Sequence, residues 1–243
     1  MTVSIRSVVI SLPVAGSAPE LLRLAADIAR LIGADLRALY VEDESLLDVA
    51  GLPLAREFDP LRPLDERWRP LLREQLARDL ELAAATLRRR LADLARTVGV
   101  RMEFSVVRAG SRPLAALDEL RGHGDFVFVV PVERKAQLPP LPAGAVLFAP
   151  SGVTRRSGDV VALADRAEAA AARLADRIAH AARARLVVID AAGDAEQLQR
   201  ALGRLRVRLI VADAGALSTI EAGARLAALR RVPVIVVPEA QRE

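Results

Sequence analysis

The stretch "DFVFVV", residues 125–130, decides the fold class of this chain. After its first residue it has no polar side chain, so a strand formed here would be buried on both faces. Such strands are typical of parallel sheets that are covered by helices on both sides. Similar short apolar runs occur before and after it, separated by stretches with apolar residues at helical spacing. The sequence therefore predicts an α/β protein with doubly wound, mostly parallel sheets.

The first 150 residues contain a full set of such elements. Strands are predicted at 7–12, 36–41, 101–107, 125–130 and 144–149. A helix over 18–33 is expected between the first two strands, and Gly33 is placed to end it.

Residues 158–238 repeat this pattern in a shorter form. Strands are predicted at 159–164, 185–190, 209–213 and 232–237, and helices at 166–182, 194–204 and 218–230. Apolar residues recur at a constant offset of 150, which supports an internal repeat: Leu24, Ala25, Ile28, Ala29, Ala34 and Leu36 reappear as Leu174, Ala175, Ile178, Ala179, Ala184 and Leu186. We therefore expect two halves, at 1–150 and 158–238, of which the second is shortened.

One long apolar stripe does not fit a plain doubly wound unit. Apolar residues follow helical spacing over 64–98, and Pro70 is compatible only with a helix that begins near it. A helix over 70–98 would be roughly 40 Å long. It would extend beyond its own domain and either cover the second half or pair with another subunit. A helix broken in two inside one domain is the alternative.

Composition excludes several classes of function. The absence of cysteine excludes disulfides, thiolate nucleophiles and cysteine-based metal sites. No apolar run has the length of a membrane span and no signal-peptide pattern is present, so we expect a cytoplasmic protein with no membrane partner. The pI of about 10.6 arises from a net charge of only +4 with a single lysine. Because acids lie among the arginines nearly throughout, no nucleic-acid partner is expected.

Three consecutive acids follow the predicted strand at 36–41. They are Glu42, Asp43 and Glu44, within "LYVEDESLLDVAGLPLAREF" at 39–58. One interpretation is a metal or acid–base cluster at the carboxyl edge of the sheet. The other is that Asp43 or Ser45 caps a helix that begins near residue 46, where acids are favoured by the helix dipole. We favour the cap. No histidine pair has metal spacing and no serine lies in a nucleophile elbow, so we predict neither a metal site nor a catalytic residue.

The order of these elements resembles that of the universal stress protein family. The resemblance is carried by "LYVEDESLLDVAGLP" from residue 39, by Gly110 and Pro113 before "LAALDELRGHGDFVFVV", and by residues 209–237. It covers 1–150 well and 158–238 more loosely, because the third strand is missing there. The resemblance implies a doubly wound parallel fold related to adenine-nucleotide hydrolase-like proteins, with members that occur as tandem copies or dimers.

The residues that bind nucleotide in that family are not matched here. Its nucleotide-binding members carry an aspartate after the first strand and a glycine-rich phosphate loop after the fourth. In the first half Leu12 and Pro13 stand where the aspartate is expected, and prolines follow 125–130 where glycines are needed. In the second half Asp165 follows the first strand, but Gly215 is not followed by a second glycine at the family's spacing. Neither half has an intact phosphate loop.

We therefore expect a non-catalytic regulatory or stress-related binding module that uses no cofactor. It would act through a protein partner or by self-association as a homodimer. The proline-rich loop 131–143 would bind a partner or replace a deleted helix with a rigid connection. The alternative is an adenine-nucleotide binder that takes ATP or AMP with Mg in a non-standard pose in the sheet crevice, with Arg108 on the phosphate. The residues that would line that site are Leu12, Pro13, Val41, Arg108, Gly110 and Ser111.

Overall fold

The computed structural model describes residues 5–13, 19–58, 61, 63, 67–109, 125–132, 144–150, 157–166, 169–190, 195–217 and 220–238. Within these residues, one sheet has nine strands in the order β5-β2-β1-β6-β7-β11-β10-β8-β9, and a separate small sheet pairs β3 with β4. The predicted α/β fold with mostly parallel strands is confirmed.

The strands of the large sheet coincide with those predicted. On one side of the sheet lie β1 (Ser7–Pro13), β2 (Asp35–Asp43), β5 (Met102–Ala109), β6 (Phe126–Pro131) and β7 (Ala145–Ala149). On the other side lie β8 (Asp159–Ala164), β9 (Leu186–Asp190), β10 (Val207–Asp213) and β11 (Val234–Val237). Neighbouring strands are parallel except for β7 and β11, which pair antiparallel and join the two groups. The division of the chain into two repeated halves stays a prediction.

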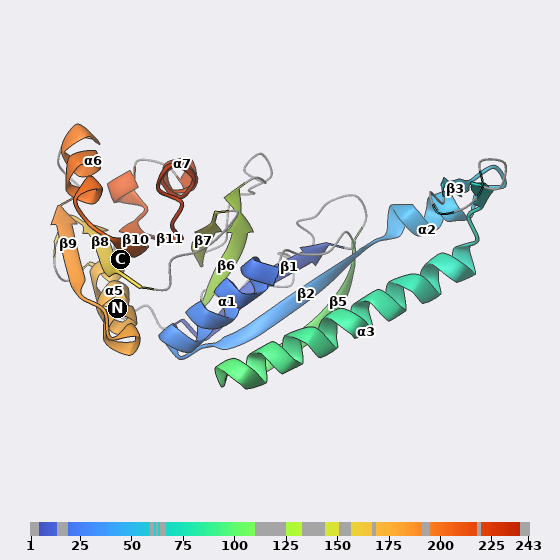
Figure 1. Ribbon diagram of the computed structural model, residues 1–243, viewed down its shortest axis with the longest axis horizontal. Helices are drawn as coiled ribbons and strands as arrows, with labels where there is room; N and C mark the ends of the chain where they lie inside the picture. The colour runs from blue at the N-terminus through green and yellow to red at the C-terminus, as the bar shows by residue number, and fades with distance from the viewer. Residues whose placement is uncertain are drawn as a thin grey trace, which may run out of the picture.

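Helices cover both faces of the sheet (Figure 1). On one face lie α1 (Pro19–Ile32), α3 (Arg73–Val98) and α5 (Ala170–Ala182), packed on one hydrophobic core. On the other lie α6 (Ala195–Gly203), α7 (Ile220–Arg230) and the short η2 (Gly215–Leu217), packed on a second core. Successive strand residues alternate between the two cores, as the pleat of a strand requires.

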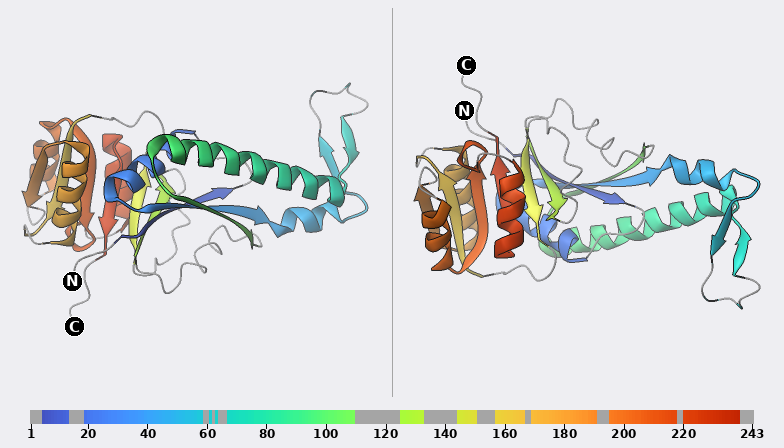
Figure 2. Two further views of the ribbon diagram at one scale, coloured as in Figure 1. Left: turned by 90° about the horizontal axis from the view of Figure 1, so that it is seen from below. Right: turned by 90° about the horizontal axis from the view of Figure 1, so that it is seen from above.

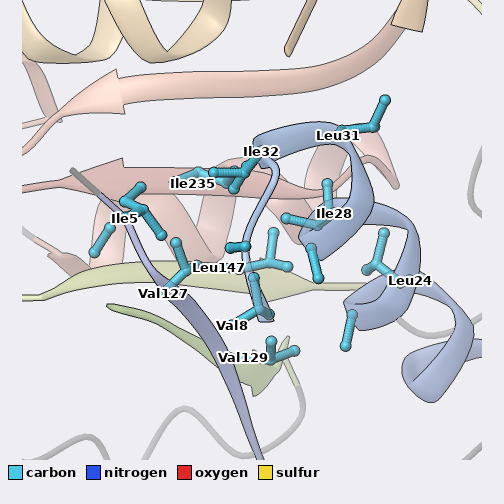
Figure 3. Packing of buried hydrophobic residues seen from close by; sticks show 14 of the residues in the cluster. Ile5, Val8, Leu24, Ile28, Leu31, Ile32, Val127, Val129, Leu147 and Ile235 are labelled. Carbon is cyan, nitrogen blue, oxygen red and sulfur yellow. The ribbon is translucent and has the colours of Figure 1, made fainter. Parts of the chain in front are cut away.

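Helix α1 lies over the junction of the two strand groups. Figure 3 shows Ile28 and Ile32 of this helix in the same core as Leu147 of β7 and Ile235 of β11. The residues that recur at an offset of 150 also pack in or against this core. Gly33 ends α1 with φ of +75°, and Ala34 N–H donates to the carbonyl of Ala29, so the predicted glycine stop is confirmed.

An arm projects from the body of the molecule (Figures 1 and 2). We define the arm as the described residues between 44 and 82, which comprise α2 (Glu44–Ala50), β3 (Arg56–Phe58), β4 (Trp68–Pro70) and the first part of α3. The helix α3 is unbroken, so the expected overhang is confirmed and the broken-helix alternative is wrong. The expectation that it covers the second half is also wrong, because the arm points away from β8–β11.

The amino-terminal part of the predicted stripe is not helical. Pro70 lies in β4, which pairs antiparallel with β3, and α3 begins three residues later at Arg73. The residues around 68 have helical spacing, but they form a strand of the β3–β4 pair. The predicted start of the helix near residue 70 was therefore too early. None of the helices in the described ranges is both long enough and apolar enough to cross a membrane.

We expect Gly158→Ala to destabilise the fold. Gly158 precedes β8 with φ of +137°, and an added Cβ would lie 2.2 Å from the backbone oxygen of Arg206. That oxygen accepts a hydrogen bond from Asp159 N–H at 2.8 Å and cannot move freely. The substitution should lower the free energy of unfolding by about 2–3 kcal/mol, measured by urea denaturation. Gly203→Ala is the control, because its Cβ would meet nothing within 4 Å. Equal losses in the two variants would contradict the packing described here.

Candidate functional site

The predicted crevice lies where β1, β2 and β5 end. Leu12 is in register with Tyr40, and Glu42 is in register with Arg108, so the three strands end at one rim of the sheet. Ligands of open α/β sheets bind outside this rim. Of the residues predicted to line the site, the structure brings Leu12, Pro13, Val41 and Arg108 to it. Gly110 and Ser111 lie outside the described residues, and for Pro13 only the backbone is described.

The apolar members of the predicted site belong to the cores. Leu12 is fully buried in the core beneath α1, whereas Val41 is buried in the core on the opposite face of the sheet. Their side chains therefore point to different faces and do not converge on a shared space. The binding of a ligand by this set stays a prediction.

Arg108 is already engaged in an ion pair. Its Nε lies 3.3 Å from Oε2 of Glu42, on the neighbouring strand. The Glu42 side chain is only 8% exposed, whereas that of Arg108 is 69% exposed. Among the described residues Glu42 is the single buried charged group. A buried carboxylate requires a partner, so a phosphate at this rim would compete with Glu42 for the guanidinium.

Tyr40 lies on the same strand face as Glu42, two residues earlier. Its ring is buried and stacks on Phe104 with the ring centroids 6.4 Å apart. Its hydroxyl is buried and has no hydrogen-bond partner among the described residues. Burial raises the pKa of Tyr40 above its ordinary value of 10.0, and the nearby negative charge of Glu42 raises this pKa further. The rim therefore combines an ion-paired acid with a buried phenol whose pKa is raised.

The three consecutive acids stand at the end of β2 (Glu42 and Asp43) and at the start of α2 (Glu44). Asp43 is the N-cap of α2, and its Oδ1 accepts hydrogen bonds from the backbone N–H of Ser45 at 2.9 Å and from its hydroxyl at 2.5 Å. Our interpretation of this acid as a cap is confirmed. No cluster of three metal-ligating side chains occurs in the described ranges.

The corresponding rim of β8, β9 and β10 is acidic. Asp165 follows β8, and Asp190 and Asp213 end the two neighbouring strands. Oδ1 of Asp213 accepts a hydrogen bond from Ala171 N–H at 3.1 Å, at the start of α5. A helix start next to the rim is where a phosphate would be held, and here a carboxylate occupies it. Sequence reasoning missed this contact, because it depends on which strand lies beside the helix.

The arm carries most of the exposed large apolar side chains. Nine of the twelve such residues in the described part of the chain lie between 46 and 82. At its tip Phe58 and Trp68 pack together with ring centroids 5.2 Å apart, and the Arg67 guanidinium lies 5.9 Å from the Phe58 ring. The nine residues are Leu46, Val49, Leu52, Leu54, Phe58, Leu61, Trp68, Leu72 and Leu82. Contiguous exposed apolar surface is a common feature of interaction sites.

Comparison with known proteins identifies the fold. No model of a known protein family matches the chain, and no curated protein matches it. A solved structure of a universal stress protein from Archaeoglobus fulgidus DSM 4304 aligns over 100% of this chain and 100% of its own, with a TM-score of 0.56 and 13% identity. The solved structure of a functionally unknown protein from Pseudomonas aeruginosa PAO1 aligns over 97% of this chain and 93% of that protein's chain, with a TM-score of 0.54 and 15% identity. The chain therefore has the fold of a universal stress protein, as its sequence resemblance implied.

We expect Arg108→Ala to lower the free energy of unfolding by about 1–2 kcal/mol, because it leaves the buried Glu42 carboxylate unpaired. Arg37→Ala is a matched control on the same two strands. Its Nε lies 2.8 Å from Glu103, but that carboxylate is 54% exposed, so its loss should cost less than about 0.5 kcal/mol. Adding Glu42→Gln to Arg108→Ala should recover most of the loss in urea denaturation. A loss that persists in the double variant would show that the ion pair is not its cause.

We expect Tyr40→Phe to weaken the decrease in the free energy of unfolding that occurs as the pH rises above 10. The unfolded chain loses its phenol proton near pH 10, whereas the folded chain holds this proton to higher pH. The stabilisation is therefore complete below pH 10 and is lost as the pH rises through the folded-state pKa. Urea denaturation at pH 7 and above pH 10 should show a smaller decrease for the variant. The variant should be as stable as the parent at pH 7, or more stable, because an unpaired buried hydroxyl is removed.

An absorbance titration checks the same point independently. Tyr40 is the only tyrosine in the chain, so phenolate absorbance reports its ionisation alone. A Tyr40 pKa in the folded protein that equals the ordinary value of 10.0 would contradict the prediction.

Proposed function

We propose that this protein is a non-catalytic binding module with the universal stress protein fold, and that it acts through protein contacts made by its arm. The proposal rests on one observation, the concentration of exposed apolar side chains in residues 46–82. Isolated exposed apolar residues are normal on a protein surface. A cluster of them lowers solubility unless a binding partner covers it. A regulatory or stress-related role in the cytoplasm accords with such a module.

The chemistry of the two rims supports a role without catalysis or a bound cofactor. At the first rim Arg108 is paired with Glu42. At the second, carboxylates stand at the strand ends, and Asp213 takes up a backbone N–H at the start of α5. Phosphate groups are held by cations and free N–H groups, whereas here carboxylates take up Nε of Arg108 at the first rim and the Ala171 N–H at the second.

Nucleotide binding is the alternative function, and one observation favours it. The Arg108 side chain is 69% exposed at the rim, so its outer nitrogens can reach a ligand while Nε holds Glu42. ATP or AMP with Mg would then bind in a pose that does not use a glycine loop.

A thermal melt separates the two functions. We expect no change in the melting temperature of the purified protein when ATP, ADP or AMP is added with Mg²⁺, because a ligand stabilises only the state that binds it. Denaturing the purified protein should release no nucleotide that mass spectrometry can detect. A melting temperature that rises with ATP in the parent but not in Arg108→Ala would establish nucleotide binding and overturn the leading proposal.

The arm is tested in living cells with a photo-crosslinking amino acid. The probe replaces Leu54, whose side chain is 89% exposed at the arm. We expect irradiation to give a covalent adduct with a protein. The control places the same probe at Leu229 on α7, which is 72% exposed and outside the arm, and should give little adduct. Equal yields at the two positions, or no adduct at Leu54, would contradict a protein-binding arm.

A further inference from the structure

We propose that the outer edge of β9 pairs with an extended segment of another protein, which adds a tenth, parallel strand to the sheet. Among the described residues β9 pairs only with β8, so it forms one end of the nine-stranded sheet. An edge strand presents a row of backbone groups that a further strand can pair with. The arm lies at the opposite end of the molecule (Figure 1), so this inference goes beyond the proposed function and does not depend on it.

The first strand group shows what fills the equivalent position. Outward from the junction, the first group runs β7-β6-β1-β2-β5 and the second runs β11-β10-β8-β9, so β9 corresponds to β2 and no described strand corresponds to β5. On β2 the N–H of Leu36 donates to the carbonyl of Arg101 at 2.8 Å, next to the start of β5. Leu186 is the counterpart of Leu36 at the offset of 150. The position that β5 takes beside β2 is therefore open beside β9.

Alternate residues of β9 direct their backbone groups to this open side. The N–H of Val160 on β8 donates to the carbonyl of Arg185 at 3.0 Å, so Arg185 and, two residues on, Val187 face β8. Leu186 and Val188 lie at the intervening positions, and their N–H and C=O groups face the outer edge. A parallel strand would pair with these groups, as β5 does with β2.

The side chains of β9 are less covered than those of β2. Ala38 is fully buried and lies opposite Phe104 of β5. Its counterpart Val188 is 47% exposed. Leu36 is also fully buried, whereas Leu186 is half-buried. A large apolar side chain on an added strand, opposite Val188, would remove this apolar surface from water.

The two ends of the sheet differ in how well they resist pairing. Proteins discourage the pairing of edge strands with charged side chains. The edge strand β5 carries Glu103 and Arg108, which both form ion pairs with β2. Residues 186–189 of β9 consist only of leucine, valine and isoleucine. Of the two edges, β9 is therefore the one suited to a partner.

Charges at the two ends of β9 specify the direction and the chemistry of the partner. Arg183 and Arg185 are exposed just before the strand, and only Asp159 balances them there, at 2.8 Å from Arg185. Asp190 is exposed at the other end, at the rim that also carries Asp165. A parallel segment that begins with an acid and ends with a base meets opposite charges at both ends, whereas an antiparallel one meets like charges. The partner is therefore an apolar extended segment with an acidic start and a basic end.

A synthetic peptide tests the backbone pairing. Its sequence, Glu-Val-Thr-Phe-Thr-Val-Lys, places the phenylalanine opposite Val188 when the glutamate lies opposite Arg185. We expect saturable binding of the labelled peptide to the full chain, measured by fluorescence anisotropy. N-methylation of both threonines removes the N–H groups that face β9 and should weaken binding about tenfold or more. N-methylation of the first valine and the phenylalanine, whose N–H groups face away, should change binding less than about twofold. Equal losses, or no binding of the unmodified peptide, would overturn the proposal.

Two matched variants locate the peptide on β9. Val188→Lys and Val106→Lys place the same charge on the two edge strands, where these side chains are 47% and 48% exposed. We expect Val188→Lys to weaken peptide binding about tenfold or more, because the ammonium group would meet the apolar side of the peptide. Val106→Lys should leave binding unchanged, and thermal melts should show that both variants remain folded. Equal effects of the two substitutions would overturn the proposal.

Two further measurements check the direction and the occupant. A peptide with its terminal glutamate and lysine exchanged should bind about threefold or more weakly, and equal or tighter binding would overturn the proposal. Sedimentation equilibrium should give the same mass for the parent and for Val188→Lys. A parent dimer that Val188→Lys converts to a monomer would show that a second copy occupies the edge and would overturn the proposal. Because the peptide and the photo-crosslink at Leu54 report on opposite ends of the molecule, failure of one leaves the other standing.

Discussion

The antiparallel pairing of β7 with β11 is the contact on which the rest of the structure depends. It joins two groups of parallel strands into one sheet, with Leu147 opposite Ile235 at its centre. Every residue of both strands is buried. An edge strand with such a sequence would be a strong site for aggregation. Pairing the two edges with each other removes this hazard within a single chain.

Both faces of this junction are closed by helices that fit it closely. Helix α1 places Ile32 over one face, in the core that includes Ile235. On the other face α7 approaches so closely that a Cβ at Gly223 would lie 2.6 Å from a methyl carbon of Val236 and 3.2 Å from the Phe148 ring. The glycine therefore sets the distance between helix and sheet. Because α1 belongs to the first strand group and contacts α5 of the second, the junction is held by helix packing as well as by strand pairing.

Much of the fold could be predicted from the sequence, because burial imposes local patterns. Strands buried on both faces, such as β6, are continuous apolar runs, and α1 shows a clear amphipathic spacing that ends at a glycine. The hairpin of β3 and β4 could not be predicted in this way. Its strands are three residues long, and the residues around Trp68 also satisfy a helical period. A pattern shared by two structures does not distinguish them, and here the pairing of Phe58 with Trp68 decided the outcome.

The candidate site was less predictable than the fold, because its contacts join residues far apart in the chain. The cap by Asp43 could be predicted, since its donor is two residues away. The pairing of Glu42 with Arg108 joins residues separated by 66 positions and depends on the register of β2 with β5. The contact of Asp213 with α5 likewise depends on strand order. In both cases the residue types were visible in the sequence, and their neighbours were not.

The reversal of direction at β7 and β11 has a consequence for any signalling by this molecule. Strands on the two sides of the junction run in opposite directions, so their carboxyl ends open at opposite rims of the sheet. One small molecule cannot touch Arg108 and Asp213 together. Ligands bound at the two rims would occupy separate sites at opposite edges of the sheet. Communication between them would have to pass through β7 and β11, every residue of which is buried.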